Sequence, residues 1–422
     1  MLIVMRRGHE GRVYATQATL TTALQKHLKI YLHKKSPSMS SNRTMKFPRS
    51  YTLLLLLLTS TLSIGGLEAS NDSPSLSSSA KHRRSASVEK ISIVGRELLV
   101  NGRPFVMQGI CYSPVRKGGT FPEDLIFNKP SKIDLAVIES DFKMMHEAGI
   151  NTIRSYVPIT DTRILDLLTK YELRTIVPVG STSQVSRAMI HSTLLLLKNH
   201  PSTLIWEVGN EWDLNYFYSK TLDPNNPEGI GFTGSLKLLE EYTKYIKSLD
   251  TMHPVSTGIS AQILKNPLFW KSIAQISSID LFGMNVYDGL SFGDRFAQWA
   301  SQSGKPLYIG ECGADAFNAI DNGEDDTSQE IATRSLITEI KHNLSALNKN
   351  HVLVGGCLFE WNDEWWKDSH GSVATHDNGG IGSAEGGPYS DYVFNEEWWG
   401  IVDIDRHARP AYATLKELYS KD

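Results

Sequence analysis

From residue 91 onward, short apolar runs alternate with longer segments in which apolar residues recur every three or four positions. The short runs are rich in β-branched and aromatic residues and are bounded by Gly, Pro, Asn or Asp, which is typical of β-strands. The pattern predicts eight strands, at 105–112, 152–157, 174–180, 203–209, 254–259, 280–287, 306–311 and 355–361.

The helical period between these runs predicts helices at 133–149, 162–173, 186–200, 236–249, 296–302, 330–344 and 411–421. Eight strands over ~320 residues, seven of them followed by a predicted helix, fit a (β/α)8 TIM barrel, which typically needs about 250 residues. An open doubly wound sheet is the alternative, but no Gly-rich phosphate loop follows the first predicted strand. Residues 91–104 indicate a short N-terminal β-hairpin with an Asn-Gly turn, and we expect this hairpin to close the bottom of the barrel.

The first ninety residues have a different character. Residues 45–69 consist of a basic head, an apolar run and a small-residue tail, which is the layout of a secretory signal peptide. Because this segment begins at an internal methionine, we expect 1–44 to be a non-native upstream extension. Cleavage near Ala69 predicts a secreted protein; the alternative is a type II signal anchor, although the apolar run is short for a stable membrane span. The Ser-rich segment 70–90 is expected to be a disordered linker before a single barrel domain at 91–422.

The formal net charge of −3 lacks the basic excess of proteins that bind nucleic acids or anionic membranes. The tryptophans are spread unevenly, since five of the nine lie in the last 62 residues, at 361, 365, 366, 398 and 399. Such crowding fits either a packed core or a surface that stacks on flat ligand faces.

Cys111, Cys312 and Cys357 lie in or beside apolar strand patterns, so we interpret them as buried, inert thiols. An odd number of cysteines leaves at least one thiol free, although a bridge between Cys312 and Cys357 stays open. Asn71 and Asn343 stand in N-x-S/T sequons, which suits an exported glycoprotein.

Two glutamates occupy strand ends in this pattern. Glu211 follows the fourth predicted strand, and Glu311 ends the seventh, although Glu is depleted in strands. In a (β/α)8 barrel the C-terminal ends of the strands face the active site. Two carboxyl groups meeting there could cleave a glycosidic bond, because one can donate a proton to the leaving oxygen while the other attacks or activates water. The alternative is that both are structural salt-bridge partners.

Several motifs then match a known family in order and spacing. The segments "NHPSTLIWEVGNEW", "GINTIRSYVPITDTRILDLLTKYELRTIVPV", "IDLFGMNVY" and "PLYIGECGADAF" resemble the barrel of the retaining β-glycosidase clan. They are similar to the catalytic barrel of glycoside hydrolase family 2 and to the 1,3-β-glucanosyltransferases. The resemblance covers about residues 91–420 and implies a retaining mechanism acting on a β-linked oligo- or polysaccharide.

The resemblance also implies residue roles. Glu211 would be the general acid/base, and Asn210 would hold the sugar 2-hydroxyl. Glu311 would be the nucleophile that forms a glycosyl ester. Arg154 matches an arginine that keeps the nucleophile ionised, and Tyr287 matches a tyrosine that hydrogen-bonds it.

In the eighth predicted strand, the family has an inward tryptophan that forms a sugar platform. Phe359 and Trp361 share one face under period-two alternation, and we favour Trp361 as the substrate-binding residue. Cys312 departs from the family pattern, since it replaces an aromatic residue next to the nucleophile. The family's usual β-sandwich domains before the barrel are not expected here.

Two alternative functions fit the same sequence pattern. The same site could transfer the glycosyl unit to another sugar, or the barrel could be an inactive carbohydrate-binding protein.

His370 and His376 do not have the spacing of a helical metal-ligand pair, and 321–326 lacks the calcium-loop pattern, so both segments are interpreted as solvated loops. No metal or cofactor is expected. The Gly-rich segment 367–397 is expected to form a wall of the substrate cleft.

Overall fold

The computed structural model describes residues 89–422, apart from 181–184, 216–230, 266, 368–370, 383–390 and 421–422. The predictions for 1–44, for 45–69 and for nearly all of the linker, including the sequon at Asn71, lie outside the described residues. Within the described part, no helix combines the length and the apolarity that crossing a bilayer demands.

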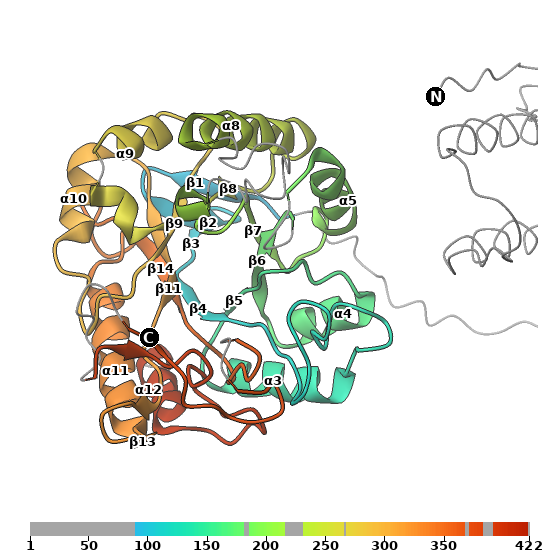
Figure 1. The fold of residues 1–422 in the computed structure, drawn as a ribbon. Helices are drawn as coiled ribbons and strands as arrows, with labels where there is room; N and C mark the ends of the chain where they lie inside the picture. The colour runs from blue at the N-terminus through green and yellow to red at the C-terminus, as the bar shows by residue number, and fades with distance from the viewer. Residues whose placement is uncertain are drawn as a thin grey trace, which may run out of the picture. The chain divides into compact units, whose positions relative to one another are not determined.

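One parallel sheet closes into a barrel (Figure 1). Over the described residues it contains nine strands, two of which are halves of one interrupted strand, so the barrel has eight strands in effect. The strands are β4 (Met107–Cys111), β5 (Thr152–Arg154), β6 (Arg174–Pro178), β7 (Thr203–Glu207), β8 (Val255–Ser256), β9 (Gly258–Ser260), β10 (Phe282–Asn285), β11 (Leu307–Cys312) and β14 (Leu353–Leu358). Only Thr257 separates β8 from β9, so the two form one interrupted strand. Because β8 pairs with β7 and β9 pairs with β10, this strand closes the ring. The (β/α)8 prediction is confirmed, and the open doubly wound sheet is wrong.

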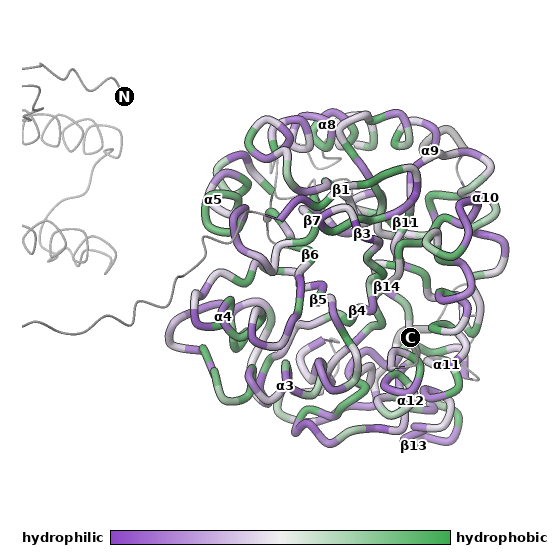
Figure 2. The backbone as a smooth tube through the Cα atoms, turned by 180° about the vertical axis from the view of Figure 1, so that it is seen from behind, coloured by the Kyte–Doolittle hydropathy of each residue, from purple (hydrophilic) through white to green (hydrophobic). Residues whose placement is uncertain are grey.

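Helices surround the barrel on the outside, as the views from both sides show (Figures 1 and 2). They are α3 (Leu135–Glu147), α4 (Thr162–Lys170), α5 (Arg187–Leu197), α8 (Gly231–Leu249), α9 (Pro267–Ala274), α10 (Arg295–Gln302), α11 (Asp326–His342) and α12 (Pro410–Tyr419). Side-chain caps begin several of them; for example, Asp134 accepts the Val137 N–H at 3.2 Å. α9 and the short 3-10 helix η1 (Ala261–Lys265) follow the fifth strand, where the sequence pattern predicted no helix.

The N-terminal segment forms a three-stranded sheet of β1 (Ile91–Val94), β2 (Glu97–Val100) and β3 (Arg103–Pro104). Its contacts lie with loops that precede barrel strands. The N–H of Ile91 donates to Met252 O at 2.9 Å, and Arg96 donates to Ser303 O at 2.6 Å. The sheet therefore covers the bottom of the barrel, as expected, with one more strand than the predicted hairpin.

Apolar side chains form two layers. One fills the space between the strands and the helices, and the other fills the barrel interior, where Met107, Ile176 and Tyr308 are buried. All three cysteines are buried and free, so the Cys312–Cys357 bridge is wrong and the prediction of buried thiols is confirmed. The interior packing leaves the C-terminal ends of the strands as the place where polar side chains gather.

Long segments follow β11 and β14 at that end. The described short strands in them are β12 (Phe317–Asn318), β13 (Gly323–Glu324), β15 (Ile381–Gly382) and β16 (Val393–Phe394), which pair as β12 with β13 and β15 with β16. After β14, the described residues Phe359, Phe394 and Trp399 reach the mouth of the barrel.

Candidate active site

Glu311 lies at the C-terminal end of β11, and three donors from two other strand ends hold its carboxylate. Arg154 Nη1 donates to Oε1 at 2.7 Å, and the Tyr156 hydroxyl donates to the same oxygen at 2.5 Å. The Tyr287 hydroxyl donates to Oε2 at 2.7 Å. The side chain is 8% exposed, and its three donors fix the orientation of the carboxylate.

Opposing effects act on the pKa of Glu311. Burial alone would raise the pKa, because a charged carboxylate loses its hydration. The positive charge of Arg154 and the hydrogen bonds from Tyr156 and Tyr287 outweigh burial and hold the pKa of Glu311 below its ordinary value. Glu311 is therefore ionised at neutral pH.

Arg154 is itself fixed by a second carboxylate. Its side chain is fully buried, and its Nη2 lies 2.8 Å from Glu207 Oε1, while Nε also donates to Glu207. Glu207 in addition accepts a hydrogen bond from Tyr308. Glu207 is not among the residues that line the cleft, so its position is that of a structural partner of Arg154. A charge-assisted, two-point contact of this kind sets the plane of the guanidinium.

Glu211 stands on a turn and not on a strand. β7 ends at Glu207, and Gly209 and Glu211 both have positive φ, of 74° and 48°. The Glu211 N–H donates to Gly258 O at 3.0 Å, and the next turn is tied down because Asp213 accepts the N–H and hydroxyl of Ser260 at 3.0 and 2.7 Å. A non-Gly residue at positive φ costs free energy, and such positions are concentrated at functional sites.

The protonation of Glu211 is opposite to that of Glu311. Burial, followed by the negative charge of Glu311, raises the pKa of Glu211 to about 7. Only a hydrogen bond with Asn285 and the more distant Arg154 act in the other direction. Two carboxyl groups in one site thus have pKa values pushed apart, which is the pattern of an acid and a nucleophile.

Asn210 lines the same cleft as the two carboxyl groups. Its Oδ1 accepts from Arg154 Nη2 at 2.8 Å and from Asn285 Nδ2 at 3.1 Å, which fixes the amide. The packing is tight here, since a Cβ at Gly310 would lie 2.5 Å from Asn285 Oδ1. Glycine is required at position 310 for this close approach.

These groups face a cleft of about 390 Å³ at the mouth of the barrel. Tyr287 contacts Trp399 edge to face, with ring centroids 5.2 Å apart, and Trp399 contacts Phe359 in the same way at 5.6 Å. Phe121 stacks on Trp366, with centroids 5.0 Å apart. The described lining residues are Ser113, Phe121, Tyr156, Asn210, Glu211, Tyr287, Glu311, Phe359, Glu364, Trp366, Lys367, Phe394, Glu396 and Trp399.

The structure thus brings Glu211, Glu311, Asn210 and Tyr287 into one cleft, with Arg154 directly behind it. It does not bring Trp361 there. Trp361 is fully buried, packs on Tyr412 with centroids 6.2 Å apart, and does not line the cleft, so its prediction as a substrate platform is wrong. β14 ends at Leu358, so the period-two alternation used to place Trp361 stops before it; Phe359 lines the cleft.

Sequence reasoning missed two residues that contact the site. Tyr156 follows Arg154 by two positions, and this spacing places both on one face of an extended segment, so the signal was present. Trp399 lies 40 positions beyond Phe359 and carries no strand or helix pattern, so no local signal could place it.

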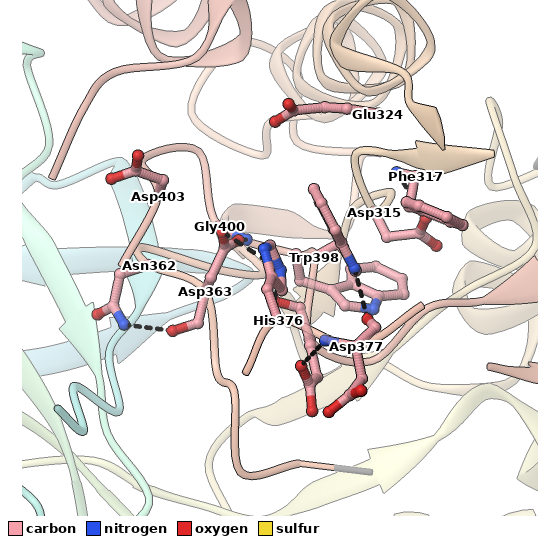
Figure 3. Close-up of polar contacts among 12 residues, drawn as sticks. Asp315, Phe317, Glu324, Asn362, Asp363, His376, Asp377, Trp398, Gly400 and Asp403 are labelled. Carbon is pink, nitrogen blue, oxygen red and sulfur yellow. Dashed lines mark hydrogen bonds and ion pairs between the residues drawn. The ribbon is translucent and has the colours of Figure 1, made fainter. Parts of the chain in front are cut away.

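His376 occupies a second polar cluster in the segment after β14 (Figure 3). Its ring stacks between Trp365 and Trp398, with centroids 5.1 and 3.4 Å away, and its Nε2 lies 3.8 Å from Asp363 Oδ2. The interpretation of His376 as part of a solvated loop is therefore wrong; His370 lies outside the described residues. Among the described residues, no group of His, Cys, Asp and Glu could hold a metal ion.

Comparison with known proteins supports the fold. No protein-family model matches the chain. It is 21% identical over 354 residues to a beta-glucuronidase of Sus scrofa, an alignment that covers 77% of this chain and 48% of that protein. Among solved structures, it resembles a GH2 beta-galacturonidase from Eisenbergiella tayi bound to galacturonate (TM-score 0.53, 18% identity, 79% of this chain and 54% of that chain). It also resembles the Bacteroides uniformis beta-glucuronidase (TM-score 0.52, 19% identity, 79% and 37%).

The chain therefore spans about half, or less, of the length of these relatives. The expected resemblance to the barrel of glycoside hydrolase family 2 is confirmed at the level of the fold. The activity of this chain is a separate question, which depends on the geometry of its own cleft.

Proposed function

We propose that this chain is a retaining β-glycoside hydrolase, which cleaves an O-glycosidic bond of a β-linked oligo- or polysaccharide by double displacement. The observation that carries the proposal is the pair of carboxyl groups in one cleft, with the pKa of Glu211 raised to about 7 and that of Glu311 lowered. The names of the similar proteins, a beta-glucuronidase and a beta-galacturonidase, support the same reaction class.

In the first step, the protonated Glu211 donates its proton to the glycosidic oxygen. Glu311 attacks the anomeric carbon, the bond from that carbon to the leaving oxygen breaks, and a glycosyl ester forms on Glu311. Asn210 would hold the 2-hydroxyl of the sugar, and the hydrogen bonds that its Oδ1 accepts from Arg154 and Asn285 support this role by fixing the amide.

In the second step, Glu211 is a carboxylate and accepts a proton from water. The water oxygen attacks the anomeric carbon, the ester bond breaks, and Glu311 is released as a carboxylate. Arg154, Tyr156 and Tyr287 stabilise the returning charge, since all three donate to that carboxylate in the free site.

A retaining reaction has two signatures that can be measured. Proton NMR of the first-formed product from an aryl β-glycoside should show the β-anomer before mutarotation. A 2-deoxy-2-fluoro glycosyl donor with a good leaving group should label the peptide that contains Glu311, as measured by mass spectrometry, and the Glu311→Gln variant should stay unlabelled. A first-formed α-anomer, or labelling of another peptide alone, would refute the proposed mechanism.

One observation favours a transglycosidase as the second candidate. The stacked pair of Phe121 and Trp366 offers an aromatic surface in the same cleft, on which an acceptor sugar could stack. Chromatography of products from a β-linked oligosaccharide separates the two activities, because transfer yields glycans longer than the substrate and hydrolysis yields only shorter ones.

Secretion, which the sequence of 45–69 predicts, remains part of the proposal, and detection of the protein in the medium of expressing cells would test it.

A further inference from the structure

Three charged side chains in the cleft have no part in the proposed mechanism. Lys367 Nζ lies 3.2 Å from Glu364 Oε2 and 3.3 Å from Glu396 Oε2, so the ammonium bridges two carboxylates. The ammonium also lies 4.0 Å from the ring centroid of Phe359. Glu364 is 3% exposed, whereas Lys367 and Glu396 are each 23% exposed toward solvent. We refer to Glu364, Lys367 and Glu396 as the cleft trio.

The cleft trio is connected to the nucleophile through aromatic contacts. Phe359, under the ammonium, contacts Trp399, which contacts Tyr287, which donates to Glu311. Members of this chain of contacts and of the trio line the same cleft. A sugar that stacks against this wall with its anomeric carbon at Glu311 would therefore present its other ring substituents to the trio.

The trio carries a net negative charge. Burial alone would lower the pKa of Lys367, but Glu364 and Glu396 outweigh burial and raise it, so the lysine is cationic. Behind the trio, burial and the charge of Glu364 raise the pKa of Glu360, which keeps its proton and hydrogen-bonds to Glu364. Burial also raises the pKa of Glu364, while Lys367 and the hydrogen bond from Glu360 oppose this rise, so Glu360 and Glu364 share one proton. The remaining carboxylate of that pair and the carboxylate of Glu396 against one ammonium leave one negative charge. Lys367 is the only Lys or Arg among the described lining residues.

We propose that the cleft trio binds the hydroxyl groups of a neutral sugar and makes the cleft discriminate against uronic acids; this inference rests on the proposed function. A sugar hydroxyl both donates and accepts, so it can satisfy a carboxylate and an ammonium together. The carboxylate of a uronic acid would meet two carboxylates beside an ammonium that both of them already neutralise, and like charges brought close together repel. The similar proteins are named for uronic acid substrates, so this substrate class separates the chain from them.

The test compares kcat/KM for 4-nitrophenyl β-D-glucoside, β-D-galactoside and β-D-mannoside with kcat/KM for the β-D-glucuronide and β-D-galacturonide. The best neutral glycoside should exceed the best uronide by at least ~100-fold. In Glu396→Gln, one negative charge is lost without a change of shape, so kcat/KM for the neutral sugar should fall about tenfold, mainly through KM. The kcat/KM for the uronide should stay unchanged, because the same substitution removes a repelling charge, so the preference for the neutral sugar should narrow by about tenfold.

Glu139→Gln is the matched control, because it removes a carboxylate that pairs with Lys170 at 2.5 Å on the outer helices, and it should leave the preference unchanged. Saturation-transfer NMR with methyl β-glycosides and methyl β-uronides measures binding independently of turnover. Preferred turnover or binding of uronides would overturn the inference and leave the glycosidase proposal standing. Selective binding of neutral sugars with no cleavage of any glycoside would overturn the proposed function and leave the inference standing.

Discussion

Two buried arginine–carboxylate pairs lie at the same end of this barrel. In the first, Arg154 shares its guanidinium between Glu207 and Glu311, and phenolic hydroxyls complete the shell of Glu311. In the second, Arg409 Nη1 and Nη2 clamp both oxygens of Asp363 at 2.7 and 3.0 Å. Glu311 lines the cleft, whereas Asp363 does not.

The two carboxyl groups respond differently to burial. Burial raises the pKa of Asp363 to about 6, in spite of Arg409 and the Gly400 N–H. Burial of Glu311 is comparable, yet the pKa of Glu311 is lowered, because Tyr156 and Tyr287 add two hydrogen bonds to the charge of Arg154. At Asp363, the charge of Arg409 and the Gly400 N–H together do not offset the effect of burial on the pKa. In the proposed mechanism, the hydrogen bonds from Tyr156 and Tyr287 keep Glu311 ionised for attack on the anomeric carbon.

The largest expected effect is on catalysis at the first pair. Glu311→Ala should lower kcat by at least about 10⁴-fold, because it removes the group that forms the covalent bond. Azide, entering the space left by the carboxylate, should restore part of the turnover. Folding should be nearly intact, since Glu207 still neutralises Arg154. Steady-state kinetics with an aryl β-glycoside and a thermal unfolding curve measure the two effects, and near-normal turnover would contradict the assignment of Glu311.

Breaking the second pair should lower the stability of the fold and leave catalysis unchanged. Arg409→Met leaves Asp363 buried without its partner, so the free energy of unfolding should fall by about 3–5 kcal/mol, while the folded fraction keeps its kcat. Denaturant titration measures this change. Arg163→Met, which removes an exposed pair with Asp161, is the matched control and should cost less than about 1 kcal/mol. A similar small cost for both variants would show that the second pair is not a clamp.

The dependence of kcat/KM on pH tests how the protonation of Glu211 and Glu311 controls the reaction. Glu211 must be protonated for the first step, so kcat/KM should fall as pH rises through about 7. Glu311 must be ionised, so activity should also fall as pH drops through the lowered pKa of Glu311.

Tyr287→Phe removes a donor that favours the charged form of Glu311, so the pKa of Glu311 should rise and the acid limb should move to higher pH. A hydrogen bond to a charged group is worth about 1.5–3 kcal/mol, so kcat/KM should fall about 10- to 100-fold. Tyr171→Phe, on the outer surface, should leave the profile unchanged. An acid limb that stays in place in Tyr287→Phe would exclude this account of the pKa.

The smallest expected effects concern Phe359 and Trp361, two aromatic residues that follow β14. Trp361→Phe should reduce the free energy of unfolding by about 1–2 kcal/mol through lost packing on Tyr412, with kcat/KM unchanged. Phe359→Leu should raise KM by less than about tenfold, because Phe359 lines the cleft and supports Lys367. Steady-state kinetics and denaturant titration on both variants measure these effects. A lower kcat/KM in Trp361→Phe would contradict the structural role and support Trp361 as a substrate platform.

The sequence by itself determined the order of strands and helices and placed Glu211 and Glu311 at the mouth of a barrel. It could do so because strand and helix periods are local, and because parallel strands that close a ring put all their C-terminal ends on one side. The roles proposed for Asn210, Arg154 and Tyr287 depended on resemblance, and the structure brings these residues to the same place.

Only the tertiary structure decided which side chains meet across loops. Trp399, the cleft trio and the clamp between Asp363 and Arg409 come from segments without periodicity, in which neighbours along the chain say nothing about direction. Trp361 was misplaced because period-two reasoning fails where the strand ends at Leu358. The pKa values of Glu211 and Glu311 likewise arise from burial and from partners far away in the chain, and these exist only once the barrel has closed.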